Sequence, residues 1–257
     1  MIQVLDLSLD MLEMLAQAEH PMRTTDIAKA LDLSLQRTNN ILRTLHRRKY
    51  VSQDEHLCYR LGGQCWKLGC SADRWADLRA AAEKPMLELS RKTGSVIFLG
   101  IMESDRLFCA TSCREGRIME IGNQQWADEL HSTASGRILL ANLPQQQRIR
   151  VLARLKRGKL TSSTVTDPAE LDRILDRVLK DGYAEVCGES RDQVASLAIP
   201  FISRKGICCA LAFSDRMEKY RELSLAEKLE LLKSTAEKME TNEIKIEQSI
   251  QKKEKRI

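Results

Sequence analysis

Apolar residues recur at helical spacing from the beginning of the chain. Between residues 4 and 19 a leucine stands at every third or fourth position, which predicts an amphipathic helix that ends before Pro21. We expect the inner side of this helix to consist of Leu5, Leu9, Leu12 and Leu15. The segment TTDIAKAL, residues 24–31, predicts a second, shorter helix whose N-terminus is capped by Thr24 or Thr25.

The third predicted helix separates apolar from polar side chains most sharply. Ser34 can cap its N-terminus, and Thr38, Ile41, Leu42 and Leu45 repeat at the spacing of a buried stripe. The opposite side carries amide, hydroxyl and guanidinium groups, namely Gln36, Arg37, Asn39, Asn40, Arg43, Thr44 and Arg47. Amides pair with adenine and guanidiniums with guanine in the major groove of DNA. The pattern therefore predicts a recognition helix, and a charged face that is merely solvated is the alternative.

Two short apolar segments, residues 50–51 and 57–61, follow with a polar turn between them. They predict a two-stranded hairpin that carries Arg60. Three helices followed by a hairpin form a winged helix-turn-helix, which we place at residues 1–69 as a DNA-binding domain. The residues expected to contact DNA are Thr24, Thr25, Ser34, Gln36, Arg37, Asn39, Asn40, Arg43, Arg47 and Arg60.

The rest of the chain mixes helical and extended patterns. Leu78, Ala82, Met86 and Leu89 predict a helix that Thr93-Gly94 ends, and we expect a linker helix at residues 70–94. Strands are expected at residues 95–102, 106–113, 116–122, 183–189, 195–202 and 207–214, and helices at 132–142, 144–156 and 168–180. A long charged helix begins near residue 218. Helices beside antiparallel strands make residues 95–257 an α+β sensor-type domain.

Charge gathers in one place along the first half. The 257 residues are 43% hydrophobic and 30% charged, which is typical of a soluble protein large enough for two domains. Residues 21–50 contain seven lysines and arginines against two aspartates, an excess equal to the net charge of +5 of the whole chain. Such a basic segment favours a polyanionic partner. The N-terminus has no basic signal region and no apolar run approaches a membrane span, so we expect a cytoplasmic protein without a membrane partner.

Several chemical functions lack their residue patterns. The eight cysteines form no CxxC pair and there are four histidines, so we expect free, mostly buried thiols and no metal site. No GxSxG, GxGxxG or GxxxxGK[ST] motif occurs, and we expect neither an enzyme nor a cofactor. Two alternatives remain: a sensor or scaffold whose first domain docks protein, and a hydrolase that uses His131 and Ser132.

Several segments match, in order, those of one family of bacterial transcription factors. They are TTDIAKALDLS (24–34), ILRTLHRRKYV (41–51), YRLG (59–62), KLG (67–69), ELSRKTG (88–94), LHSTASGRILLANLP (130–144), TSSTVTDPAEL (161–171), DGYAE (181–185) and ASLAIPFI (195–202). On these segments nearly the whole chain resembles the isocitrate-lyase-regulator (IclR) family. The resemblance implies a winged helix-turn-helix joined by the linker helix to a GAF-like effector-binding and oligomerisation domain.

The resemblance also implies an effector pocket on one face of the sheet. Free N–H groups at the helix start in HSTASG, with the Ser132 and Ser135 hydroxyls, suit a small carboxylate. Aligned to the family's pocket, the candidates are Leu130, Ala134, Ser135, Gly136, Cys187, Glu189, Ser196, Ala212 and Ser214. The family's effectors are small organic, sugar-derived or aromatic acids. N-capping is the alternative role of the two serines in HSTASG, and core filling that of Cys187 and Ser196.

Partners and departures complete the expectation. The resemblance implies a dimer, or a tetramer of two dimers, and we expect it to bind a near-palindromic double-stranded operator. Of the two possible actions, repression and activation, we favour repression. Many members carry Lys-Ser-Thr-x-x-Arg at the start of the recognition helix, where this chain has Leu35, Gln36, Arg37 and Asn40. We therefore expect it to read a different DNA sequence. The family's acidic run after Gly-Tyr-Ala is reduced here, and Gln193 stands at a glycine position.

Overall fold

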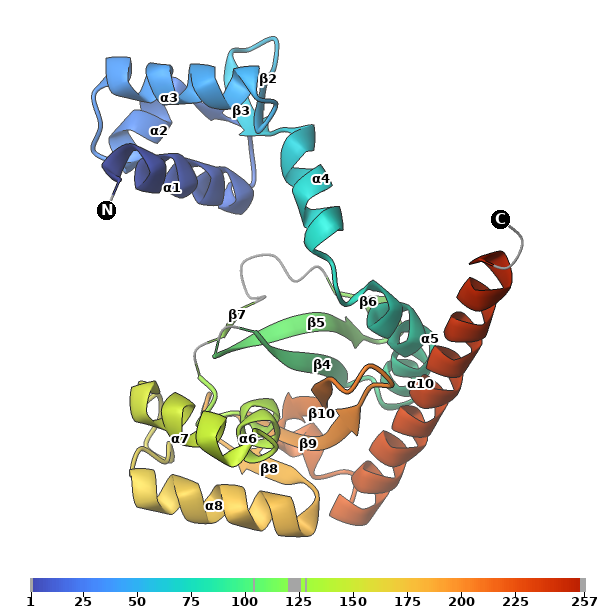
Figure 1. Cartoon of the computed structure of the whole chain (residues 1–257). Coiled ribbons are helices and arrows are strands. Elements are labelled where there is room, and N and C mark those ends of the chain that lie inside the picture. The colour runs from blue at the N-terminus through green and yellow to red at the C-terminus, as the bar shows by residue number, and fades with distance from the viewer. Residues whose placement is uncertain (1, 104, 120–125, 128, 255–257) are drawn as a thin grey trace. The chain divides into compact units, whose positions relative to one another are not determined.

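The computed structural model describes residues 2–103, 105–119, 126–127 and 129–254 (Figure 1). The chain divides into two compact units, Met1–Arg74 and Trp75–Ile257. Helices flank an antiparallel sheet in the second unit, so the expected α+β class is confirmed. The end of the strand expected at 116–122 lies outside the described residues.

The first unit is a small helical fold with a three-stranded sheet. Its elements are α1 (Gln3–Gln17), β1 (Met22–Arg23), α2 (Thr24–Ala30), α3 (Leu35–Arg47), β2 (Val51–Gln53), β3 (Cys58–Leu61) and α4 (Gly63–Ala72). The three predicted helices and the hairpin are present, and the sheet order is β1-β3-β2. The strand β1 escaped prediction because two residues are too few to show an alternating pattern. The core consists of Met11, Leu15, Ile27, Ile41, Leu42, Leu45, Val51 and Tyr59.

The inner side of α1 differs from the one expected. Leu5 and Leu9 are 54% and 49% exposed, whereas Met11 is fully buried and Leu15 nearly so. Leu7, Leu12 and Met14 pack partly against the same core. The buried stripe therefore follows residues 7, 11 and 15, and methionine fills the place that we had assigned to leucine. An unbranched thioether side chain fits an irregular core gap well.

The second unit is built on one antiparallel sheet. Its elements are α5 (Ala76–Thr93), β4 (Val96–Glu103), β5 (Arg106–Arg114), β6 (Arg117–Ile118), β7 (Trp126–Ala127), α6 (Ala134–Ala141), α7 (Gln145–Arg154), α8 (Pro168–Asp181), β8 (Ala184–Cys187), β9 (Val194–Ile202), β10 (Cys208–Arg216), α9 (Met217–Tyr220) and α10 (Leu225–Glu254). The sheet has the order β6-β5-β4-β10-β9-β8, and β7 pairs with β5. Asp167 caps α8 by accepting a hydrogen bond from the Glu170 N–H at 2.7 Å, and Pro168 occupies its first turn.

The linker helix expected at residues 70–94 is two helices. α4 ends at Ala72, where Asp73 leaves the helical conformation with ψ at 84°, and α5 begins at Ala76. Leu78, Ala82, Met86 and Leu89 are buried in the core of the second unit. α5 is therefore a structural helix of that unit and not a free connection. Gly94 ends it in the left-handed conformation, as predicted.

The two faces of the sheet carry side chains of different size. α5 and α10 cover one face, whereas α6 and α8 cover the other (Figure 1). On β10, Leu211 and Phe213 point towards α5 and α10, whereas Ala210 and Ala212 point towards α6. Gly136 of α6 comes so close to the preceding segment that a Cβ would lie 2.3 Å from the Leu130 carbonyl oxygen. Gly136 thus lets the segment before α6 lie directly against the helix, and small side chains on β10 face α6.

Thiols are spread over both units. All eight cysteines are free: Cys109, Cys113 and Cys209 are buried, Cys58, Cys65 and Cys208 are partly buried, and Cys70 and Cys187 are exposed. Burial raises the pKa of the Cys109 thiol to about 12. Within the described ranges, no three histidine, cysteine or acidic side chains gather as a metal site would require, and no helix has both the length and the apolar character of a membrane span.

The buried carboxylate of Asp215, at the end of β10, binds Ser95, which follows the Gly94 cap of α5. Asp215 Oδ2 accepts a hydrogen bond from Ser95 Oγ at 2.6 Å and lies 3.1 Å from Lys219 Nζ. Burial of the carboxylate opposes ionisation, but the hydrogen bonds from Ser95 and Arg216 and the Lys219 ammonium together lower the pKa of Asp215. The charged form is therefore the one that the fold stabilises.

We expect Asp215→Asn to lower the free energy of unfolding at pH 7 by about 1–3 kcal/mol, because charge-assisted hydrogen bonds are lost. The folded-state pKa is lowered, so this stabilisation is present at neutral pH and disappears as the pH falls through the folded-state value. Urea unfolding of both proteins between pH 7 and 3 measures the difference. Asp181→Asn, at the exposed end of α8, is the control. A constant difference at every pH would contradict the assignment.

Candidate functional site

The polar side of α3 is open to solvent, as its pattern predicts. Thr38, Ile41, Leu42 and Leu45 are buried, and Ser34 Oγ caps the helix by accepting a hydrogen bond from the Arg37 N–H at 3.3 Å. On the opposite side, the exposed predicted residues are Gln36, Asn39, Asn40, Arg43 and Arg47. The helix thus presents amides and guanidiniums in a single row, which is the chemistry that reads base edges.

Two guanidiniums on α3 have partners within the first unit. Arg43 Nη2 donates to Asn40 Oδ1 at 3.4 Å, so these two side chains already lie side by side. Arg37 is half-buried, and its Nη2 donates to Gln3 Oε1 of α1 at 3.1 Å. A base contact by Arg37 would have to replace that hydrogen bond. Asn40 and Arg43 are therefore better placed for base contacts than Arg37.

The remaining predicted DNA-binding residues lie around this helix. Thr24 is the first residue of α2 and is half-buried, and Thr25 is exposed. Neither caps α2, because Arg23 occupies the cap position without a side-chain hydrogen bond. Arg60 is exposed on β3, and its Nε donates to Ser52 Oγ at 3.4 Å across the hairpin. These side chains are suited to phosphate contacts, which position a protein on DNA.

In the second unit, the predicted pocket residues surround the start of α6. Leu130 and Ala134 are buried in the cluster that joins α6 to the sheet, and Ser135 is 6% exposed. Thr133 caps the helix, with its Oγ1 accepting from the Gly136 N–H at 3.1 Å. The Ser132 hydroxyl donates to the Glu129 carbonyl oxygen at 3.3 Å. Neither serine is the cap, so N-capping is not the role of Ser132 or Ser135.

Three further predicted residues lie on the sheet face beneath α6. Ser214 pairs with Ser196 across β10 and β9, and Ala212 pairs with Ala198 on the same face. α6 packs on both strands. Ser214 Oγ lies 3.4 Å from the Ala195 carbonyl oxygen. This face therefore joins small apolar side chains with hydroxyl groups on strands that α6 covers, which is chemistry that suits a small polar ligand.

Cys187 does not meet the other pocket candidates. Side chains alternate along β8, and Ala184 and Val186 belong to the cluster under α6. Glu185, which shares the opposite face with Cys187, accepts a hydrogen bond from the Tyr220 hydroxyl at 2.7 Å. Cys187 is exposed on that side. We therefore leave it out of the candidate pocket.

Glu189 is engaged in a buried ion pair that the sequence pattern does not reveal. Its Oε2 lies 2.5 Å from Arg137 Nη2 and accepts the Val165 N–H at 3.1 Å. Arg137 Nε also donates to the His131 carbonyl oxygen at 2.9 Å. Arg137 is a cation inside an otherwise apolar helical segment. Because a buried cation needs an acidic partner, this position was the one sequence signal for such an ion pair. Glu189 therefore has a structural role and offers no free carboxylate.

His131 also has a structural position. Its imidazole is buried, and Nε2 lies 2.9 Å from the Gly158 carbonyl oxygen, so this nitrogen carries the proton. Its Nδ1 has no hydrogen-bond partner among the described residues. The imidazole thus holds the chain after α7 against the start of α6. None of the contacts of Ser132 involves the imidazole, so the pair lacks the nucleophile–base hydrogen bond of a hydrolase.

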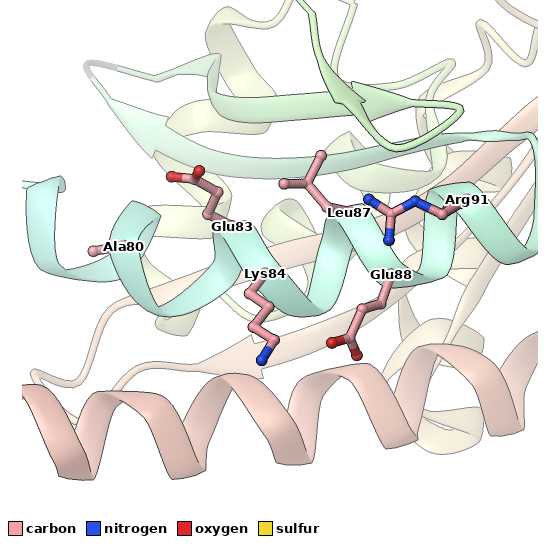
Figure 2. Close-up of a pocket in the computed structure, with 6 residues that line it drawn as sticks. All are labelled: Ala80, Glu83, Lys84, Leu87, Glu88 and Arg91. Carbon is pink, nitrogen blue, oxygen red and sulfur yellow. The ribbon is translucent and has the colours of Figure 1, made fainter.

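A hollow on the other side of the second unit has different chemistry. It has a volume of about 400 Å³ and is lined by residues of α5, as Figure 2 shows: Ala80, Glu83, Lys84, Leu87, Glu88 and Arg91. Lys84 and Glu88 point towards α10, and Glu88 pairs with Lys238 of that helix at 3.1 Å (Figure 2). Charges of both signs line it, and the sheet separates it from α6. We do not assign the effector to it.

Two sequence profiles match the chain in succession. Residues 4–55 match the profile described as the IclR helix-turn-helix domain, and residues 71–241 match that of the bacterial transcriptional regulator IclR C-terminal region. The chain belongs to the IclR family. A glycerol operon regulatory protein of Streptomyces coelicolor (strain ATCC BAA-471 / A3(2) / M145) is 32% identical over 79% of this chain and 80% of its own. The first unit is the helix-turn-helix domain of an IclR-family transcriptional regulator.

Solved structures of IclR proteins share the fold. The IclR protein of Thermotoga maritima has a TM-score of 0.76 at 20% identity, covering 94% of this chain and 98% of that one. An IclR homolog of Microbacterium hydrocarbonoxydans, complexed with 4-hydroxybenzoate, has a TM-score of 0.77 at 19% identity, covering 93% and 98%. The fold of each unit is thus that of the IclR family.

We expect either Arg137→Met or Glu189→Gln alone to lower the free energy of unfolding by about 3–5 kcal/mol, because each disrupts a buried ion pair. The double variant should lose less than the sum of the two. Urea unfolding of the four proteins measures this coupling. Lys205→Met, which removes an exposed pair with Asp77, is the control and should cost at most about 1 kcal/mol. Simple additivity would show that the two side chains do not depend on each other.

Proposed function

We propose that this IclR-family regulator binds a near-palindromic operator as a dimer, or as a tetramer of two dimers, with one α3 helix in the major groove of each half-site. The observation that carries the proposal is the row of exposed amides and guanidiniums on α3, opposite a fully buried stripe. Two recognition helices of a symmetric assembly reach half-sites about one helical turn apart. We assign repression as its action, because a bound dimer blocks the DNA that it covers.

We propose further that a small carboxylate binds beneath the start of α6 and changes the affinity for the operator. Ser135, Ser196 and Ser214 supply hydroxyls, and Leu130, Ala134 and Ala212 supply the apolar wall. The relatives named above include a glycerol operon regulator and a homolog complexed with 4-hydroxybenzoate, and these names support a small polar effector. An aromatic or sugar-derived acid fits the same chemistry.

For the effector to act, it must favour one arrangement of the DNA-binding units over another. α5 is part of the core of the second unit, so a change in the sheet can reach its N-terminal end. The chain leaves the helical conformation between α4 and α5, and we place the pivot at residues 73–75. A cytoplasmic location follows from a function on DNA.

We expect Asn40→Ala and Arg43→Ala each to weaken base discrimination, by about 1–3 kcal/mol for each bidentate pair with a base that the variant cannot form. Fluorescence anisotropy with genomic fragments selected by the wild-type protein, and with random duplexes, measures the difference. Lys233→Ala on α10 is the control, since it removes an exposed charge from the second unit. Equal reductions on both DNAs would mean that these side chains touch only phosphates. No binding of any duplex at low salt would support the scaffold alternative instead.

We expect Ser135→Leu to abolish the response to carboxylate effectors while DNA affinity stays within about twofold, because a larger side chain fills the proposed pocket. The readout is operator release during titration with a panel of small aromatic and sugar-derived acids. Cys187→Ala is the matched control, since this side chain lies on the opposite face of the sheet. If the response survives Ser135→Leu, or is abolished in Cys187→Ala, the pocket lies elsewhere.

A further inference from the structure

A second concentration of positive charge lies outside the helix-turn-helix domain. Residues 130–166 contain seven lysines and arginines and not one aspartate or glutamate. This excess is larger than the net charge of +5 of the whole chain. The segment covers α6, α7 and the chain that follows α7. A charge of one sign at this density needs either internal partners or an external one.

Internal contacts account for three of the seven. Arg137 pairs with Glu189, as described above. Arg148 turns inward to α8, where its Nη2 lies 2.6 Å from Asp172 Oδ1 and 2.9 Å from Asp176 Oδ1. Arg157 is half-buried and donates to the Leu152 carbonyl oxygen at 2.9 Å. Each of these three side chains is thus held by an ion pair or by a backbone carbonyl oxygen, and we assign it a structural role.

The other four bases have no such contacts. We name Arg150, Arg154, Lys156 and Lys159 the α7 basic patch. All four are exposed, and none forms an ion pair with an acid of the described residues. Arg150 and Arg154 stand one helical turn apart, where like charges repel each other. The folded protein thus concentrates four positive charges that form no ion pair among the described residues.

Part of the patch lines a hollow, and the surrounding segment has no aromatic side chain that could anchor a protein interface. Val151, Arg154, Leu155, Lys156 and Asp105 line a hollow of about 240 Å³. Its rim has two cations against one carboxylate. Residues 130–166 contain no tryptophan, tyrosine or phenylalanine, and the exposed apolar side chains beside the patch are Ile149 and Leu160. Aromatic side chains in packed pockets are the anchors that this segment lacks, whereas its arginines and lysines supply the charge that phosphate contacts need.

We propose that the α7 basic patch contacts the phosphate backbone of the DNA that α3 holds. The inference rests on the proposed function, because DNA bound by the first unit is tethered to the second unit through the chain, which raises the effective concentration of its phosphates. The patch adds affinity that does not depend on base sequence. Its second effect is a steeper salt dependence, since each neutralised phosphate releases counterions.

The test compares two full-length variants in which the same amount of positive charge is removed. In the patch variant, Arg150, Arg154, Lys156 and Lys159 are changed to glutamine, and in the matched control the exposed Arg173, Lys180, Lys233 and Lys245 are changed to glutamine. Affinity for a duplex with long flanks is measured by anisotropy between about 50 and 200 mM KCl. We expect the slope of log affinity against log salt to become shallower by about 0.9 for each phosphate that the patch variant no longer neutralises, on operator and random DNA alike. The control should keep the wild-type slope.

Each outcome supports or overturns the proposed role of the patch. A patch variant with the wild-type slope overturns it, and so do equal changes in both variants, which would reflect net charge alone. Disappearance of the slope difference when the duplex is trimmed to the two half-sites would show that the patch reaches flanking DNA. Thermal unfolding of both variants establishes that they are folded. If the wild-type protein binds no DNA, the proposed function fails as well, whereas binding with an unchanged slope in the patch variant rejects only the α7 basic patch.

Discussion

The close approach of α6 to the sheet is the constraint on which the second unit depends. On β9 and β10 the residues that face α6 include Ala198, Ala210 and Ala212, whereas leucine and phenylalanine face α5 and α10. Gly136 in turn admits no Cβ beside the Leu130 carbonyl oxygen of the segment before α6. Small side chains let the helix and the sheet come together. The hydroxyls of Ser196 and Ser214 lie on the same side of the sheet as these alanines. The buried pair of Arg137 and Glu189 then ties α6 to the segment that follows β8. The apolar residues of the proposed effector site are therefore also residues that pack α6 against the sheet.

The first unit depends on a different separation, that of two sides of one helix. α3 buries four side chains and turns its amides and guanidiniums to solvent, so the residues that stabilise the fold differ from those that we propose to read DNA. This separation made the helix predictable from sequence, because a period of 3.6 residues marks both sides at once. Changes on the outer side can alter the DNA sequence that is read while the core stays intact.

The features that the sequence did not predict have several physical causes, and the first is contact between residues far apart in the chain. Arg137 and Glu189 are 52 positions apart, and no local pattern connects them. Regular spacing favours a stripe of leucines on α1, whereas the core takes Met11 between Leu7 and Leu15 and leaves Leu5 and Leu9 exposed. The helix α4 ends before Asp73 although neither proline nor glycine occurs in residues 70–76, so the sequence has no local signal for this break. Cys187 is different, since strict alternation along β8 predicts its orientation and only the family resemblance placed it in the pocket.

The distribution of thiols has a practical consequence. Burial keeps Cys109 and its buried neighbours unreactive, whereas Cys70 on α4 and Cys187 on β8 are open to reagents. One of these sulfurs belongs to each unit. Spin labels or fluorophores attached to these two cysteines would report the distance between the two units of one polypeptide. Measured with and without a candidate effector, that distance would show whether the ligand changes the arrangement of the units.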